Sequence, residues 1–147
     1  MNKNIILLVE DDKDDQVFAQ EAFEEVEMNK HAQLHIVEDG EDLFKYLDKV
    51  NGYQDRNKHP LPHIILLDLN LPKKDGRVSL QEIKKSIDFK HIPVIVFTTS
   101  SLEEDIKECY YLGANSYIVK PDSRDDFNII FKKINCYWFN ITTLPKH

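Results

Sequence analysis

The sequence lacks long hydrophobic runs, is poor in cysteine and has no excess of basic residues. Its first apolar run, Ile5–Val9, is too short for a signal-peptide core or a membrane span, so we expect a cytoplasmic protein. The formal net charge of −7 disfavours general affinity for nucleic acid or anionic lipid, because both attract basic surfaces. No repeats and no low-complexity tract are present.

The two cysteines, Cys109 and Cys136, do not have the spacing of a metal site. Cys109 falls within a helical pattern and is predicted to be a small buried apolar residue in a reducing compartment. With 41% apolar residues, the chain can bury a core without disulfides or a structural metal. A length of 147 residues suits one domain, since compact domains most often have about 100–150 residues.

Short apolar runs recur along the chain, at Ile5–Val9, Leu34–Val37, Ile64–Leu67, Val94–Phe97 and Tyr117–Val119. The runs at positions 5, 64 and 94 are continuous and rich in Ile, Val and Leu. Strands that are buried on both faces have this composition, which predicts a parallel sheet covered by helices.

Apolar residues at helical spacing predict five helices between and after these strands. They are marked by Ala19, Ala22, Phe23 and Val26; by Leu43 and Leu47 after the Gly40 turn; by Leu80, Ile83 and Ile87; by Leu102, Ile106 and Cys109 before Gly113; and by Phe127, Ile130, Phe131 and Ile134, with an extension toward Trp138. The polar stretch Asn51–Pro62 contains two prolines and is predicted to be a long surface loop. The alternation predicts a doubly wound α/β domain with a five-stranded parallel sheet.

In such a sheet, ligands bind at the carboxyl ends of the strands. Here those ends are followed or occupied by Glu10–Asp12, Asp68, Thr98 and Lys120. Carboxylates and phosphate oxygens suit Mg²⁺, an aspartate can accept a phosphoryl group, and a hydroxyl and an ammonium can bind that group. Singly, each feature has a structural reading: Asp12 as the cap of the first helix, Asp68 in an Asx turn, Thr98 as a cap, and Lys120 in a loop before Pro121. Only their combination indicates phosphoryl transfer.

These motifs resemble the response-regulator receiver family over about residues 4–135. The matching segments are Ile6–Asp12, Asp68–Pro72 with Gly76, Pro93–Thr99, and Gly113–Ala114 followed by Tyr117–Pro121. The resemblance implies a flavodoxin-like (β/α)5 fold for a single receiver domain over residues 1–147, in which residues 136–147 extend the last helix and form a tail. Val78 and Ser79 depart from the family pattern, but they lie on the third helix rather than at the site.

The resemblance implies a role for each matching residue. Asp68 would be the phosphoacceptor, Asp11 a direct Mg²⁺ ligand, Glu10 a ligand through water, Asn70 a ligand through its backbone carbonyl, Thr98 and Lys120 the partners of the phosphoryl group, and Tyr117 a switch residue. The donor would be a phosphohistidine on a sensor histidine kinase. The chain would catalyse only its own phosphorylation and dephosphorylation, and is otherwise not an enzyme.

The long loop and the aromatic tail resemble the single-domain regulators that partner bacterial phytochrome kinases. About eight residues would follow the last helix, too few for a DNA-binding module, so we expect output through protein contacts. Beyond the helical stripe, Asn128, Ile129, Cys136, Tyr137, Trp138 and Phe139 predict a homodimer through the last helix. The alternative is that the rings fold back over the bottom of the sheet.

Other classes fit less well. A phosphatase of the haloacid-dehalogenase type needs an acid two residues after its nucleophile, and Asn70 occupies that position. A flavin carrier needs a hydroxyl- and glycine-rich phosphate loop, whereas the acidic segment Glu10–Asp15 would repel phosphate. The same segment breaks the ligand order of a calcium loop and has no glycine after it. A degenerate receiver used only for binding would be expected to have lost part of the site.

Overall fold

The computed structural model describes residues 3–147 and contains one parallel sheet, with strand order β2-β1-β3-β4-β5. The strands are β1 (Asn4–Val9), β2 (Ala32–Val37), β3 (Ile64–Leu67), β4 (Val94–Thr98) and β5 (Ser116–Val119). All four pairings are parallel. The strand order reverses at β1, so the ends of β1 and β3 lie side by side at the point where such sheets bind ligands.

The helices between and after the strands are α1 (Lys13–Glu25), α2 (Gly40–Asp48), α3 (Gly76–Lys85), α4 (Glu103–Tyr111) and α5 (Arg124–Ile134). Four of them begin at a residue whose side chain accepts a backbone N–H of the first turn, namely Asp12, Asp39, Asp75 and Ser123. This confirms Asp12 as the cap of α1. The predicted doubly wound, flavodoxin-like fold is also confirmed.

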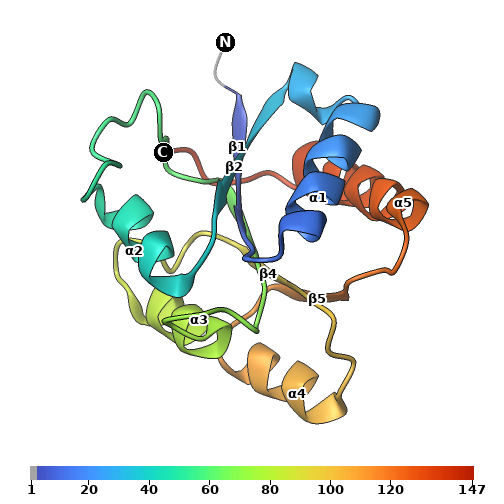
Figure 1. Cartoon of the computed structure of the whole chain (residues 1–147). Helices are drawn as coiled ribbons and strands as arrows, with labels where there is room; N and C mark the ends of the chain where they lie inside the picture. The colour runs from blue at the N-terminus through green and yellow to red at the C-terminus, as the bar shows by residue number, and fades with distance from the viewer. Residues whose placement is uncertain (1–2) are drawn as a thin grey trace.

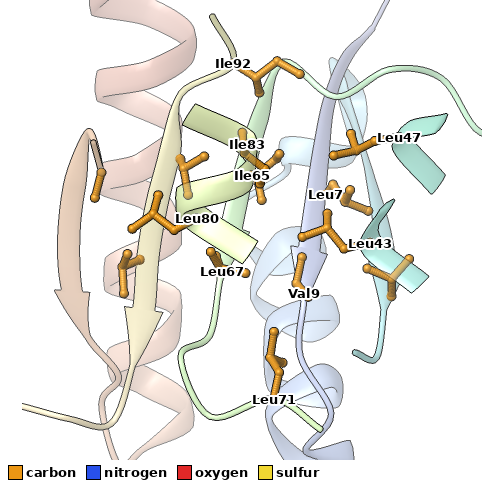
Figure 2. Packing of buried hydrophobic residues seen from close by; sticks show 14 of the residues in the cluster. Leu7, Val9, Leu43, Leu47, Ile65, Leu67, Leu71, Leu80, Ile83 and Ile92 are labelled. Carbon is orange, nitrogen blue, oxygen red and sulfur yellow. The ribbon is translucent and has the colours of Figure 1, made fainter. Parts of the chain in front are cut away.

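The helices form a layer on each face of the sheet. Figure 1 shows α1 and α5 together on one side and α2 and α3 on the other. Alternate residues of the central strands point to the two layers: Leu7 and Val9 pack with α2 and α3, as Figure 2 shows, while Ile6 and Leu8 pack with α1 and α5. Burial on both faces explains the continuous apolar runs in β1, β3 and β4.

The predicted third helix extended to Ile87, and this was wrong. Helix α3 ends at Lys85, because Ser86 leaves the helical conformation at φ −74° and ψ 127°. The Ser86 hydroxyl then accepts the backbone N–H of Asp88 over 3.2 Å. Ile87 is 83% exposed and contributes nothing to the core.

The last helix runs on past Trp138, as predicted, but in a different helical form. A π-helical segment, Asn135–Ile141, follows α5, and Thr142 donates its backbone N–H to the carbonyl of Tyr137 over 2.8 Å. Trp138 and Phe139 fold back against the core layer of α1 and α5, whereas Tyr137 is half exposed. The alternative that the aromatic rings fold back is therefore correct for Trp138 and Phe139 but not for Tyr137.

The segment 51–62 is a loop between α2 and β3, as predicted. Arg56 holds it by donating to the carbonyl oxygens of Tyr46 at 3.0 Å, Leu47 at 2.6 Å and His59 at 3.0 Å. Cys109 is completely buried, also as predicted. Within residues 3–147, none of the helices has the length and apolarity that a bilayer crossing requires.

Candidate functional site

The polar strand-end residues meet at one edge of the sheet. Glu10 follows β1, Asp68 follows β3, Thr98 ends β4, and Lys120 follows β5. All four are buried, although their side chains are polar or charged. Buried charges require partners, and here they find them in one another.

An acidic cluster forms where β1 and β3 end. Glu10, Asp11 and Asp68 can each offer one carboxylate oxygen such that all three oxygens lie within 4.8 Å of one another. Glu10 and Asp68 are buried, and Asp11 is exposed on the solvent side. Hard oxygen donors with one open side match the requirements of Mg²⁺ and similar divalent cations. The residues present therefore fit a divalent cation.

Glu10 shows the electrostatic cost of this crowding. The pKa of Glu10 is raised to about 7, mainly by burial; Lys120 opposes this rise, and the nearby carboxylate of Asp68 contributes to it. Two buried carboxylates at close quarters repel each other, which favours the proton on one of them. Any cation that binds here relieves the same repulsion.

Lys120 provides the fixed positive charge of the site. Its ammonium pairs with Glu10, with Asp15 at 2.9 Å and with Asp68 at 3.2 Å. Burial alone would lower the pKa of Lys120. The hydrogen bond and charge of Glu10, then the hydrogen bond of Asp15 and the charge of Asp68, raise this pKa above its ordinary value. Lys120 therefore remains an ammonium beside Asp68.

Thr98 contributes a buried hydroxyl. The residue has 0% exposure, and its Oγ1 has no hydrogen-bond partner within residues 3–147. A buried polar atom without a partner costs about 1–3 kcal/mol, so its presence at a strand end needs a reason. A hydroxyl in this position can donate to an oxygen of a group attached to the neighbouring Asp68.

Asn70 and Tyr117 lie at the border of the site. The exposed Asn70 donates its backbone N–H to Asp68 Oδ1 over 3.4 Å. Tyr117, on β5, is half-buried, and its hydroxyl donates to the carbonyl oxygen of Ser100 over 2.9 Å. Thus every residue to which the sequence assigned a role in phosphoryl transfer, metal binding or switching lies at or beside this edge of the sheet.

Sequence reasoning missed Asp15 as a member of the site. In the sequence, Asp15 counted only as part of an acidic segment that would repel phosphate. In the structure, it pairs with Lys120. The feature that could have predicted this role is the position of Asp15 in the first turn of α1. Helical side chains point back toward the helix N-terminus, which here means toward the end of β1.

Comparisons with known proteins agree with this geometry. The family model of the response regulator receiver domain matches residues 6–132. The response regulator Rcp1 of Synechocystis is 40% identical over 141 residues, covering 96% of this chain and 92% of Rcp1. The Mn²⁺-bound structure of Rcp1 superposes with a TM-score of 0.84 and covers 97% of this chain and 99% of that one.

Two further solved structures are similar over nearly their whole length. The phosphorylated cyanobacterial phytochrome response regulator RcpA is 39% identical, with a TM-score of 0.89 and coverage of 99% and 100% of the two chains. The response regulator RPA3017, in red light signaling of R. palustris, is 33% identical, with a TM-score of 0.91 and coverage of 98% and 99%.

Proposed function

We propose that Asp68 is the phosphoacceptor of this chain, which belongs to the response regulator receiver family and acts in two-component signalling. The observation that carries the proposal is that Asp68 belongs to the acidic cluster and also lies 3.2 Å from the buried ammonium of Lys120. An acceptor needs a nucleophilic carboxylate with positive charge beside it, because phosphoryl transfer is catalysed mainly by positioning and charge stabilisation.

In the proposed reaction, a carboxylate oxygen of Asp68 forms a bond to phosphorus. The bond between phosphorus and the imidazole nitrogen of a kinase phosphohistidine breaks, and that nitrogen keeps the electron pair and takes a proton from solvent. The product is an aspartyl phosphate and a neutral histidine. Hydrolysis by water later restores the Asp68 carboxylate and releases phosphate, so the chain catalyses only its own modification and its reversal.

Each neighbour of Asp68 has a task in this proposal. Lys120 pairs with an oxygen of the transferred group, and the unpartnered hydroxyl of Thr98 donates to another. The acidic cluster, with the backbone carbonyl of Asn70, would hold Mg²⁺, which supplies positive charge that offsets the charge of the phosphoryl group. Glu10 would act through a water molecule and Asp11 directly.

The descriptions of two relatives support a proposal about the kind of sensor histidine kinase that donates the phosphoryl group. RcpA is described as a phytochrome response regulator, and RPA3017 acts in red light signaling. We therefore propose a bacterial phytochrome kinase as the partner of this chain. Because such kinases take their phosphoryl group from ATP, the exchange would occur in the cytoplasm.

Output is proposed to pass through the receiver surface, with residues 1–147 acting as one receiver unit and no contact to nucleic acid. A homodimer through α5 is part of the proposal. Val119, Ile129 and Tyr137 expose apolar surface on β5, on α5 and on the π-helical segment after it, at 41%, 50% and 51%. Exposed aromatic and aliphatic groups are typical of protein interfaces.

The test is phosphorylation of Asp68→Asn by a small phosphodonor and by a phytochrome kinase, followed by intact-protein mass spectrometry. We expect the variant to keep its fold and lose labelling, because an amide cannot form the acyl phosphate. Asp122→Asn is the control, since it removes one exposed carboxylate from the loop after β5. Labelling of folded Asp68→Asn at the wild-type level would refute the assignment.

A further inference from the structure

We propose that Asp15 is a positioning residue that holds the Lys120 ammonium beside Asp68 while a divalent cation occupies the acidic cluster. This inference rests on the proposed function and adds to it a residue that has no place in the cluster itself. Its basis is that three carboxylates contact Lys120, but only two of them belong to the acidic cluster.

Two of those carboxylates are shared with the acidic cluster. Glu10 and Asp68 contact Lys120, and both also offer oxygens to the cluster that fits a divalent cation. A cation draws carboxylate oxygens toward itself, so these contacts with Lys120 weaken when the cation binds. Asp15 lies outside the cluster and keeps its oxygen for Lys120 alone.

The Asp15 contact has the geometry of a strong pair. Its Oδ2 accepts a hydrogen bond from Lys120 Nζ over 2.9 Å. The side chain of Lys120 is 4% exposed and that of Asp15 is 22% exposed. Water therefore screens this pair far less than an ion pair on the surface, and an ammonium–carboxylate hydrogen bond is about twice as strong as a neutral one.

Asp15 is carried by a rigid element. The Asp12 side chain accepts the backbone N–H of Asp15 over 3.0 Å and thereby fixes the first turn of α1. One turn later, Phe18 packs on Phe127 of α5 with ring centroids 5.5 Å apart. The helix that carries Asp15 is thus anchored to the α5 layer.

Lys120 needs such an anchor because its long side chain has many rotamers. An ammonium has three N–H donors, and the transferred phosphoryl group requires one of them. With Asp15 holding another donor, the ammonium already lies beside Asp68 and does not have to leave other rotamers first. Removal of this anchor is expected to slow phosphorylation about tenfold, since small displacements of a catalytic group have effects of this order or larger.

The experiment compares the variants Asp15→Ala, Asp15→Asn and Asp14→Ala in the complete chain. Asp14→Ala is the matched control, because this substitution removes the same charge from the same helical turn, at an exposed position. Three quantities are measured: the side-chain ¹⁵N–¹H ammonium signal of Lys120 with and without Mg²⁺, the Mg²⁺ dissociation constant by calorimetry, and the phosphorylation rate with phosphoramidate at saturating Mg²⁺.

We expect the ammonium signal of Lys120 in the Mg²⁺-bound state to broaden or vanish in Asp15→Ala, and to persist in Asp14→Ala. The phosphorylation rate should fall about tenfold in Asp15→Ala and less in Asp15→Asn, because an amide oxygen still accepts a hydrogen bond from the ammonium. The Mg²⁺ dissociation constant should change by the same small factor in Asp15→Ala and Asp14→Ala. A purely structural role would not give partial rescue by the amide.

Two results would overturn the inference. One is a wild-type ammonium signal in Asp15→Ala, and the other is a loss of Mg²⁺ affinity much larger than in Asp14→Ala, which would make Asp15 a cation ligand. Failure of the proposed function is distinguishable, because then wild-type protein would not be phosphorylated while the ammonium signal would still report on Asp15. If Asp15→Ala does not fold, Asp15→Asn and Asp15→Ser provide the same comparison.

Discussion

The hydroxyl of Tyr117 donates a hydrogen bond to the backbone carbonyl oxygen of Ser100 over 2.9 Å. The Ser100 hydroxyl in turn donates to Asp105 over 2.6 Å, and Asp105 pairs with Arg77 over 2.8 Å. The loop after β4, which directly follows Thr98, is thus tied to β5, α4 and α3. A movement of Thr98 can therefore be transmitted through these hydrogen bonds to the surface of the protein.

The first prediction concerns this connection. A phosphoryl group on Asp68 should draw Thr98 inward, move the loop and break the bond between Tyr117 and Ser100, because the two states of the loop have different hydrogen bonds. With ring-labelled tyrosine, the NMR signal of Tyr117 should shift when a beryllofluoride mimic is added. Tyr111 is the internal control, since it is 90% exposed at the end of α4. An unmoved Tyr117 signal in the loaded protein would contradict the switch.

The second prediction concerns the cation. Asp11→Ala should weaken Mg²⁺ binding about tenfold or more, or about 1.4 kcal/mol, because it removes one negative ligand from the cluster. Calorimetric titration measures this directly. Asp14→Ala, which removes an exposed carboxylate three residues further along the chain, should bind Mg²⁺ nearly as the wild type does. Equal affinities of the two variants would place the ligands elsewhere.

The third prediction concerns the backbone beneath the acceptor. A Cβ atom on Gly76 would lie 2.1 Å from the Asp68 carbonyl oxygen, so Gly76→Ala must displace the acceptor loop. We expect a loss of about 2–4 kcal/mol in the free energy of unfolding, together with slower phosphorylation.

Gly52→Ala is the matched control for this variant. Gly52 has φ +102° but nothing within 4 Å of an added Cβ, so only backbone strain of about 1 kcal/mol is expected. Urea unfolding of both variants tests the difference. If the two are equally stable, the close approach of Gly76 to Asp68 is not what requires glycine.

The fourth prediction separates interface from core in the tail. Tyr137→Ala should convert the proposed dimer to a monomer in sedimentation without loss of thermal stability, because its ring is half exposed. Trp138→Ala should instead cost about 2–3 kcal/mol of stability, because the indole packs against the layer of α1 and α5. A wild-type protein that is monomeric at tens of micromolar, phosphorylated or not, would exclude the dimer.

Most of the fold and the main site residues could be predicted because they depend on local rules. Continuous apolar runs require strands buried on both faces, and alternation with helices requires those strands to be parallel. Parallel strands put their carboxyl ends at one edge, so Asp68 and Lys120 had to come near each other. The extent of α3 was missed at Ile87, because the side chain and backbone of Ser86 end the helix regardless of the apolar spacing.

What the sequence by itself determined is therefore the order of the elements and the edge at which their polar ends meet. Only the tertiary structure decided that Trp138 packs against the core while Tyr137 remains half exposed. The two residues are adjacent in the sequence and point to different sides of the same helical segment. The tertiary structure also decided that Asp15 reaches Lys120, which lies 105 residues away. Sequence periodicity indicates which face of a helix is buried. A hydrogen bond between distant residues depends on how α1 packs against α5 near the end of β5, and no local pattern contains that information.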